Sequence, residues 1–440
     1  MRCSGLWLVV VLAVSLPVAV LLAAGTGSAL VDQYAGTESC KPCHPEQYGH
    51  FLESSHRKYV RPATTDTVGG DFVTNNILKA GDYDNTMTTR DGQFFVRTVG
   101  PDGKYREYRC ESVIGFTYKQ RYSTTLPDGR RYALPVQWNV HEKKWVDYHG
   151  LAREKPGTGH FWCDPETSLG LACAGCHFTG VDLLPVKGSH IPRVVAAEQT
   201  IGCEACHGPC KQHVDQPKDP AAVLSLRTLS AQRQVDLCGQ CHSRGRDPQA
   251  GTEYPFLFRP GDRLAAKYAL VEPLIGKTTD AFWADGQALQ HHQQYTDYIA
   301  SAHYLRAGMT CTACHDPHRR AQPAMVKVAG NDLCLDCHTD FKGDDPLKNH
   351  TRHDPKKEGS ACIPCHMPRI MKNETPMQTP THTFWPPNPL KTIAWNTPNA
   401  CSICHDGTHK DAKQKTPQQV LEELVKWKNA PQPVILKQAK

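Results

Sequence analysis

The chain has 440 residues, of which 39% are apolar and 21% charged, with 33 Gly, 33 Pro, 20 Cys and 23 His. Gly and Pro show no repeat and the formal net charge is only +6, which excludes collagen, a coiled coil and an extended disordered chain. The mean hydropathy of −0.51 is low for this length, so side chains alone would form a thin core.

Residues 1–29 have the pattern of a secretory signal peptide. Arg2 supplies a short positive region, residues 6–24 carry no charge, and Gly27-Ser28-Ala29 offers small residues for cleavage. A retained anchor is the alternative, because this apolar run is close to the length that crosses a bilayer. Both alternatives predict an exported protein, in the periplasm or at the cell exterior, which is membrane-anchored only if the signal is retained.

Sixteen of the cysteines form eight copies of one pattern, Cys-x-x-Cys-His. In chain order the first cysteines are Cys40, Cys173, Cys203, Cys238, Cys311, Cys334, Cys362 and Cys401. The second cysteines are Cys43, Cys176, Cys206, Cys241, Cys314, Cys337, Cys365 and Cys404. The histidines that follow them are His44, His177, His207, His242, His315, His338, His366 and His405. Chance would supply roughly 0.05 copies in such a chain.

This spacing suits the covalent attachment of a c-type haem. The two thiols can bind the two vinyl groups of a porphyrin, and the next histidine then lies beneath the iron as its proximal ligand. Zinc and thioredoxin-type sites also use two cysteines at this spacing, but neither requires a histidine after every second cysteine. The sequence therefore predicts eight covalently attached c-type haems, whose macrocycles fill the core and on whose attachment folding depends.

The remaining histidines are the best candidates for the sixth, distal ligands, because few methionines are available. If residues 48–56 are helical, His56 lies about 18 Å along the axis from His44, so it must serve another iron. The same argument about reach applies to His213 and His318. A helical face that includes His292 and His303 precedes the fifth motif. The predicted distal ligands are His56, His213, His303, His318, His353 and His382, with His292 and His350 as weaker candidates.

The motif spacing divides the chain into segments. The first motif stands alone in a haem segment at 30–56, and the other seven lie in a heptahaem domain at 166–405. Between them, residues 57–165 contain no motif. Turn sequences at 100–103 and 127–129 separate strand-like runs there, which predicts a small β-rich, antiparallel insert. The tail, 406–440, is expected to carry a short helix from Thr416 that ends before Pro431.

The predicted fold class is a multihaem cytochrome c that is mainly α, with much irregular structure, a haem-filled core and this β insert. Three cysteines lie outside the motifs of the mature chain, namely Cys110, Cys163 and Cys210. If two of them form a disulfide, at least one thiol is left over. The pairing considered is Cys163 with Cys210.

The segment Cys203–His213 resembles the CEACHGPGSxH signature of multihaem cytochromes c related to the tetrahaem nitrification cytochrome, hydroxylamine oxidoreductase and pentahaem nitrite reductase. Similar blocks are found at 308–318, 362–368 and 398–405, and their order resembles octahaem members of this superfamily. The resemblance implies stacked haem pairs and bis-His sites in a mainly helical scaffold. Cys210 replaces the usual glycine of the signature, and the tetratricopeptide repeats often fused to these members do not follow His405.

Two functions are open on this basis. In the first, which we favour, an octahaem c-type cytochrome moves electrons between extracytoplasmic redox partners through closely packed, mostly bis-His haems. In the second, a multihaem oxidoreductase acts on a small nitrogen or sulfur compound, such as nitrite or hydroxylamine, at one open haem. All eight motifs end in His, so the Lys-terminated variant of the nitrite reductase's catalytic haem is absent, and whether the chain is an enzyme is undecided.

Expected partners are other redox proteins or quinol-linked membrane complexes, with self-association as a further alternative. Removal of Arg2 with the signal lowers the formal charge from +6 to +5. Sixteen haem propionates, with about eight net positive centres when the haems are ferric, then give roughly −3 in the oxidised and −11 in the reduced protein. No nucleic-acid partner is therefore expected.

Overall fold

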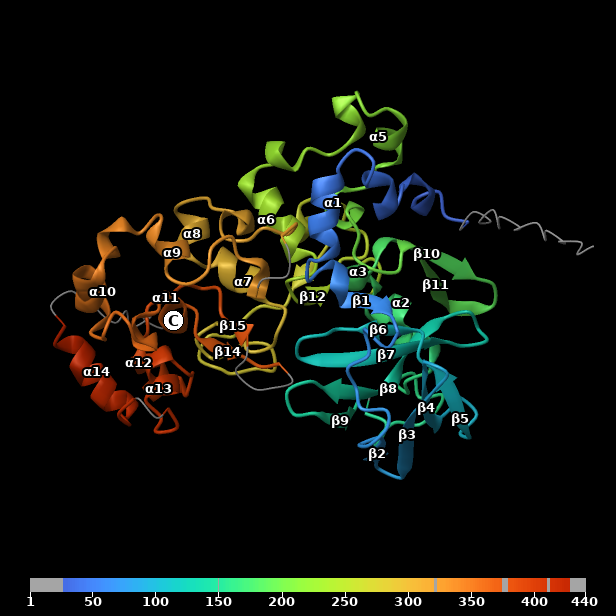
Figure 1. Ribbon diagram of the computed structural model, residues 1–440, viewed down its shortest axis with the longest axis horizontal. Coiled ribbons are helices and arrows are strands. Elements are labelled where there is room, and N and C mark those ends of the chain that lie inside the picture. Colours follow the sequence, from blue (N-terminus) through green and yellow to red (C-terminus); the bar gives the residue numbers. More distant parts are fainter. Residues whose placement is uncertain (1–26, 149, 320–322, 374–378, 410–411, 428–440) are drawn as a thin grey trace, which may run out of the picture.

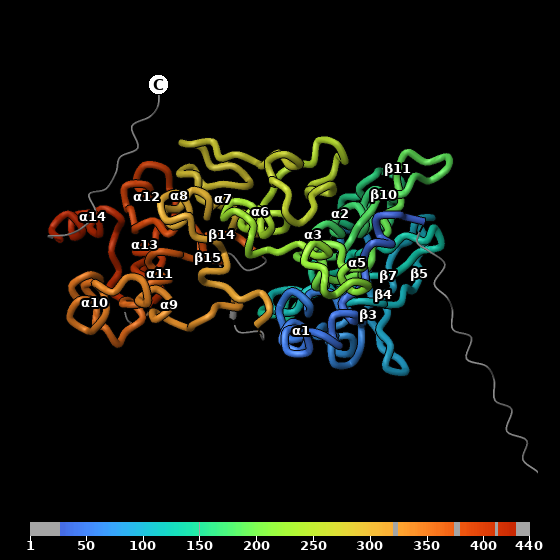
Figure 2. The backbone as a smooth tube through the Cα atoms, turned by 90° about the horizontal axis from the view of Figure 1, so that it is seen from above, coloured from blue at the N-terminus to red at the C-terminus, as the bar shows by residue number. Residues whose placement is uncertain are grey.

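The computed structural model describes residues 27–148, 150–319, 323–373, 379–409 and 412–427. The predicted signal peptide lies almost entirely outside these ranges. The described chain is elongated, with the larger β-sheets at one end and short helices at the other (Figures 1 and 2). Within these ranges, no helix is both long and apolar enough to cross a membrane.

Residues 60–147 form two antiparallel sheets. Their strands are β1 (Val60–Pro62), β2 (Ile77–Ala80), β3 (Tyr83–Arg90), β4 (Gln93–Val99), β5 (Tyr105–Arg109), β6 (Ser112–Ile114), β7 (Lys119–Thr125), β8 (Arg131–Asn139) and β9 (Lys144–Asp147). The five-stranded sheet has the order β1-β6-β7-β8-β9, and the four-stranded sheet has the order β2-β3-β4-β5. Both predicted hairpins, β4–β5 and β7–β8, are confirmed. The β3–β4 turn places Asp91 and Gly92 at φ 53° and 70°, which suits a type I′ hairpin.

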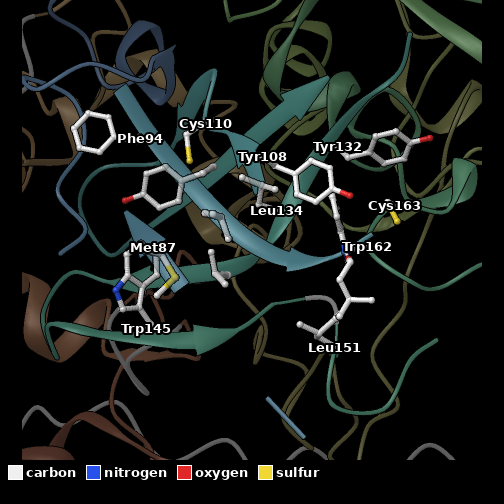
Figure 3. Packing of buried hydrophobic residues seen from close by; sticks show 14 of the residues in the cluster. Met87, Phe94, Tyr108, Cys110, Tyr132, Leu134, Trp145, Leu151, Trp162 and Cys163 are labelled. Carbon is white, nitrogen blue, oxygen red and sulfur yellow. Dashed lines mark hydrogen bonds between the residues drawn. The ribbon is translucent and has the colours of Figure 1, made fainter. Parts of the chain in front are cut away.

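The two sheets share one apolar core. Met87 and Val96 from the four-stranded sheet and Tyr122 and Leu134 from the five-stranded sheet are fully buried in the same cluster. Trp162 closes this core and donates its indole N–H to the carbonyl of Val99 at 2.8 Å (Figure 3). This part of the chain therefore has a side-chain core of its own, independent of any haem.

The β structure extends beyond the predicted insert, so the expectation of only a small β insert is wrong. Strands β10 (Thr179–Val186) and β11 (Ser189–Glu198) form a long hairpin, and two short pairs follow, β12 (Gly245–Arg246) with β13 (Ala269–Leu270) and β14 (Arg369–Met371) with β15 (Thr379–Pro380). Pro185 and Pro192 lie inside the β10–β11 hairpin, where they weaken a strand prediction. A two-stranded ribbon tolerates proline because each strand has an unpaired edge.

The helices are short and separated by irregular chain. They are α1 (Pro45–Leu52), α2 (Leu169–Ala172), α3 (Ala174–His177), α4 (Glu204–His207), α5 (Lys211–Asp215), α6 (Ala231–Gly239), α7 (Gln294–Ile299), α8 (Ala302–Leu305), α9 (Asp332–Leu335), α10 (Asp344–Thr351), α11 (Cys362–His366), α12 (Pro389–Trp395), α13 (Ala400–Cys404) and α14 (Pro417–Val425). Helices α9–α14 lie at the end of the molecule opposite the β-sheets, and α6 and α7 lie between (Figures 1 and 2).

Two helix predictions need correction. Helix α1 ends at Leu52, so His56 lies beyond it rather than on its third turn. The expected continuous helix from His292 to His303 is broken between α7 and α8, because the Ser301 hydroxyl accepts the backbone N–H of Tyr304 and starts a new helix. The C-terminal helix is present, and Thr416 and Gln419 form a capping box at its start.

Candidate functional site

Each Cys-x-x-Cys-His motif folds as one tight turn. In seven motifs the backbone N–H of the histidine donates to the carbonyl of the first cysteine at 2.8–3.1 Å. The remaining motif, at Cys362–His366, forms helix α11. Because residues i and i+3 of such a turn lie on one face, this geometry brings both thiols and the histidine to the same side of the chain. That is the arrangement that covalent haem attachment needs.

Seven of the eight motif histidines face a second histidine from elsewhere in the chain. The ring centres are 5.9–6.4 Å apart in the pairs His44–His213, His242–His56, His207–His318, His315–His382, His338–His303, His366–His350 and His405–His353. In these seven described pairs no hydrogen bond joins the two rings, and the distance between ring centres is nearly the same in all of them.

This separation matches a metal held between two imidazoles. Two metal–nitrogen bonds of about 2 Å, with each nitrogen about 1.1 Å from its ring centre, place the ring centres about 6.2 Å apart. The motif residues present therefore fit a haem iron with histidine on both sides. Haem iron supplies reversible one-electron transfer at such a position.

The surrounding backbone orients several of these rings. Nδ1 of His315 lies 2.8 Å from the carbonyl of Ala324, and Nδ1 of His405 lies 2.7 Å from that of Lys413. Nδ1 of His353 lies 2.6 Å from the carbonyl of Thr351. A carbonyl fixes the proton on Nδ1 and leaves Nε2 free for the metal, which is the usual outer-shell arrangement for ligating histidine.

Burial keeps several of these imidazoles neutral. It lowers the pKa of His56 to about 4 and that of His382 to about 3, and nearby histidines add to both shifts. Burial also lowers the pKa of His177 to about 4, with a further contribution from Arg121. Since only neutral imidazole binds a metal, these residues are in their ligating form at neutral pH.

The structure brings all six of the stronger distal candidates opposite a motif histidine. For His56, His213 and His318, this histidine does not belong to the motif that directly precedes the candidate in the sequence. His350, a weaker candidate, pairs as well. His292, the other weaker candidate, is placed differently: its ring packs edge-on against His291 at 4.5 Å. The ligand roles themselves stay predictions.

Cysteine contacts link the motifs to one another. Thiols of different motifs interact directly in the pairs Cys40–Cys203, Cys176–Cys241, Cys238–Cys311 and Cys334–Cys362. Cys314 is within electrostatic reach of Cys334, and Cys365 of Cys404. Cys206 is similarly close to Cys241. Together, these direct interactions and electrostatic proximities link the first motif through the third to the eighth, and they link the second motif to the fourth.

Two buried carboxylates that the sequence analysis missed hold this arrangement together. Glu204, only 1% exposed, accepts hydrogen bonds from the backbone N–H groups of Ala35, Gly36 and Cys210 at 2.7–2.9 Å. It thereby ties the N-terminal segment to the third motif. Its position between Cys203 and Cys206 could have identified it in the sequence. A carboxylate buried between two haem-binding cysteines needs hydrogen-bond donors around it.

The second carboxylate is Asp297 of α7, which is also 1% exposed. It accepts from the Thr381 hydroxyl at 2.6 Å, the backbone N–H of Ala288 at 2.9 Å and that of His382 at 3.0 Å. It therefore fixes the backbone that presents His382 to His315. No pattern in the sequence marked this residue, because its partners are far away along the chain.

The three described cysteines outside the motifs do not pair. Cys110, Cys163 and Cys210 are buried and free, so the considered Cys163–Cys210 disulfide is wrong. Cys163 packs in the β core, whereas the Cys210 thiol lies 3.2 Å from the carbonyl of Gly208. Cys210 has φ −113° at the start of α5, so this position of the signature does not require glycine here.

Comparison with known proteins decides the class to which these motifs belong. The model of a doubled CXXCH motif matches residues 303–343, and the model of cytochrome c554 and c-prime matches residues 138–208. The chain is a multihaem c-type cytochrome. The predicted covalent attachment of several haems is thereby confirmed, whereas the count of eight and the finer likeness to octahaem members stay predictions.

Individual relatives cover different shares of this cytochrome. It is 28% identical over 180 residues to the multihaem cytochrome MtrA of Shewanella baltica (strain OS185), a match that covers 39% of this chain and 53% of the relative. The cytochrome thus spans about half the length of that curated relative. The crystal structure of outer cell wall cytochrome OcwA has a TM-score of 0.64 at 22% identity, covering 90% of this chain and 87% of the other, which shows a shared fold. The octahaem sulfite reductase MccA of Wolinella succinogenes has a TM-score of 0.38 at 15% identity, covering 80% and 58%.

Proposed function

We propose that this multihaem cytochrome is an electron conduit that carries eight c-type haems and passes electrons between extracytoplasmic redox partners. The observation that carries the proposal is the set of seven His–His pairs at iron-spanning distance, in motifs whose cysteines lie close to those of neighbouring motifs. Electron transfer needs closely spaced redox centres, and the contacts between motifs supply that spacing.

The chain's own residues suit this role in a second way. A histidine on each side of an iron leaves its coordination unchanged when its charge changes, and backbone carbonyls that face two of the rings keep those rings in place. The motifs also follow the long axis of the molecule, from α3 and α4 near the β-sheets to α13 near α14 (Figures 1 and 2). The two ends of the array are thus far apart and available to different partners.

The proposed location is outside the cytoplasm. The signal-like sequence at 1–29 supports export, and OcwA, which shares the fold, is described as an outer cell wall cytochrome. A redox protein at one end and a second redox protein or a quinol-linked membrane complex at the other are the partners that such a conduit would serve.

Fast-scan voltammetry of the oriented, fully matured protein tests the proposal. Glu422→Cys on the exposed face of α14 would attach the cytochrome to gold by the end nearest the eighth motif. We expect eight electrons per molecule to exchange with the electrode. The double variant Cys334→Ala and Cys337→Ala removes the haem of the sixth motif, which lies between the fifth and the seventh. At high scan rate only the haems of the seventh and eighth motifs, on the electrode side of this gap, should then exchange electrons.

Cys40→Ala with Cys43→Ala is the matched control. It removes one site at the far end of the array, so seven electrons should still exchange rapidly. If loss of the sixth site removed only its own electron, as in the control, the conduit would be rejected.

A further inference from the structure

The His–His pair of the fifth motif is hydrogen-bonded to the backbone on both sides. Nδ1 of the motif histidine, His315, lies 2.8 Å from the carbonyl oxygen of Ala324. Nδ1 of the facing histidine, His382, lies 3.2 Å from the carbonyl oxygen of Pro380. Both rings of this pair therefore donate a proton from Nδ1 to a carbonyl and keep Nε2 for the metal.

The pair of the eighth motif has the same arrangement. Nδ1 of the motif histidine, His405, lies 2.7 Å from the carbonyl oxygen of Lys413. Nδ1 of the facing histidine, His353, lies 2.6 Å from the carbonyl oxygen of Thr351. The fifth and eighth pairs are thus alike, although different stretches of the chain supply their four carbonyls.

The other five pairs differ from these two. Within the described part of the chain, none of them has a backbone carbonyl on both rings. At the seventh motif only His366 is hydrogen-bonded to the backbone, and at the fourth motif Nδ1 of His242 faces a side-chain amide oxygen at 3.3 Å. At the first and sixth motifs the facing histidines, His213 and His303, bury Nδ1 without a described hydrogen-bond partner.

This difference in hydrogen bonding bears on the reduction potential of the iron. A carbonyl that accepts the proton of Nδ1 makes the imidazole more basic, so that Nε2 donates more electron density to the metal. A stronger donor stabilises the ferric state relative to the ferrous state and lowers the reduction potential. Hydrogen bonding of the ligands is one of the ways in which a protein tunes haem iron. Two such bonds on one iron act in the same direction.

Carboxylates reinforce the effect at the eighth motif. Glu358 and Asp406 lie within electrostatic reach of the Cys404 thiol. Negative charge near an iron favours its ferric state, which carries one more positive charge than the ferrous state. Lys415 lies within reach of Cys401, but it is itself paired with Glu423 at 2.5 Å. The charges around this motif therefore favour a low potential as well.

We propose that the fifth and eighth irons have the lowest reduction potentials of the array. This deepens the proposed electron conduit and rests on it. The fifth motif lies between the fourth and the sixth, so a partly reduced molecule would hold its electrons in two groups of sites, motifs one to four and motifs six and seven. An electron that enters at the eighth motif moves on to sites of higher potential. The electron donor is therefore expected at this end of the molecule, near α13.

An equilibrium redox titration of the fully matured protein, followed by its visible absorption, tests the order of the potentials. The double variant Cys401→Ala and Cys404→Ala lacks the haem of the eighth motif. We expect it to lose one of the last two electrons that the array takes up as the potential falls. The matched double variant Cys334→Ala and Cys337→Ala, at the sixth motif, should lose one of the first six. Loss of one of the first six electrons in the eighth-motif variant would overturn the proposal.

A replacement that keeps every haem tests the hydrogen bonds themselves. Nδ1-methylhistidine in place of His405 cannot donate to the carbonyl of Lys413, yet it keeps Nε2 for the iron. Lys413 is exposed, so its loop can yield to the added methyl group. We expect one of the two low-potential electrons to be taken up at a higher potential, and the same replacement at His315 should shift the other. The control is replacement of the exposed His44, which should shift the titration much less. Equal shifts at His405 and His44, or no shift at either, would contradict the proposal.

These results are distinct from those that test the conduit. The order of the potentials is measured at equilibrium, whereas the conduit is tested by the rate of electron exchange with an electrode. Rapid exchange in a molecule whose fifth and eighth irons are reduced early would leave the conduit intact and overturn the inference. The expected order of potentials in a molecule whose sites respond independently would do the reverse.

Discussion

Asp297 accepts the backbone N–H of His382 at 3.0 Å, and through this bond α7 holds the histidine that faces His315. We expect Asp297→Ala to lower the free energy of unfolding at pH 5 by about 3 kcal/mol, because it leaves buried donors without an acceptor. It should also loosen His382 and give a new high-spin EPR signal from the fifth site. Denaturant unfolding and EPR measure the two effects, and a destabilised variant with unchanged EPR would show that Asp297 does not position this ligand.

The same carboxyl predicts a dependence of stability on pH. Burial raises the pKa of Asp297 from its usual value of 3.8 to about 6. Between these values the folded protein holds a proton that the unfolded chain has released, so this group's contribution to stability falls as the pH rises from about 4 to 6, by about 3 kcal/mol. Asp297→Asn does not titrate, so the stability of the wild type relative to this variant should fall across that window. A constant difference would contradict the raised pKa.

Gly175, inside the second motif, should be irreplaceable. A Cβ at this position would lie 1.8 Å from the Tyr254 ring, which is buried and anchored by its hydroxyl to the carbonyl of Gly170 at 2.6 Å. We expect Gly175→Ala to lose the haem of the second motif and keep the other seven, as read from the mass of the intact protein. The control is Gly49→Ala in α1, where a Cβ meets nothing within 4 Å and the haem count should be unchanged.

The eighth site offers a test of ligand assignment. His353 faces His405 with ring centres 6.3 Å apart. His353→Ala should open this iron and add one carbon monoxide bound per reduced chain, while His353→Met should keep it six-coordinate and raise its reduction potential. His50→Ala, at an exposed histidine of α1, is the control. Equal carbon monoxide binding in His353→Ala and the control would mean that another residue ligates the eighth iron.

The three cysteines outside the motifs should be inert thiols. Burial raises the pKa of Cys163 and of Cys210 to about 12, and Cys110 shifts in the same direction for the same reason. Only the thiolate reacts quickly with disulfide reagents, so the folded protein should show none of these thiols and the unfolded mature protein three. Fewer than three after unfolding would indicate a disulfide.

Local patterns and long-range contacts differ in how well the sequence predicts them. The motif turns and the β4–β5 and β7–β8 hairpins depend on residues no further apart than Lys119 and Asn139, and the sequence locates them correctly. The sequence predicts that His56 faces a motif other than its own, and the structure places its ring opposite His242, although the helix assumed in that argument ends at Leu52. Which distant motif His56 faces depends on the tertiary fold, and spacing contains no such information.

The errors have equally specific causes. The apolar periodicity from His292 to His303 predicts one helix, but the Ser301 side chain caps the start of a second helix. Such a cap divides the helix while the periodic pattern of the sequence stays the same. Pro185 and Pro192 hide the β10–β11 hairpin. The sequence analysis does not identify Asp297 and Glu204, because a buried carboxylate is stabilised by its hydrogen-bond partners, and these partners are known only from the folded chain.

The exchange of histidines between distant motifs has a consequence for biosynthesis. His44 faces His213, and His207 faces His318, so if these pairs ligate iron, the first and third sites are completed only by later stretches of the chain. The last two motifs, by contrast, are completed by His350 and His353, which precede them. With the proposed ligands, haem would be attached at the first and third motifs before these sites are complete, and they would gain their second histidine only after the chain has been made as far as His318.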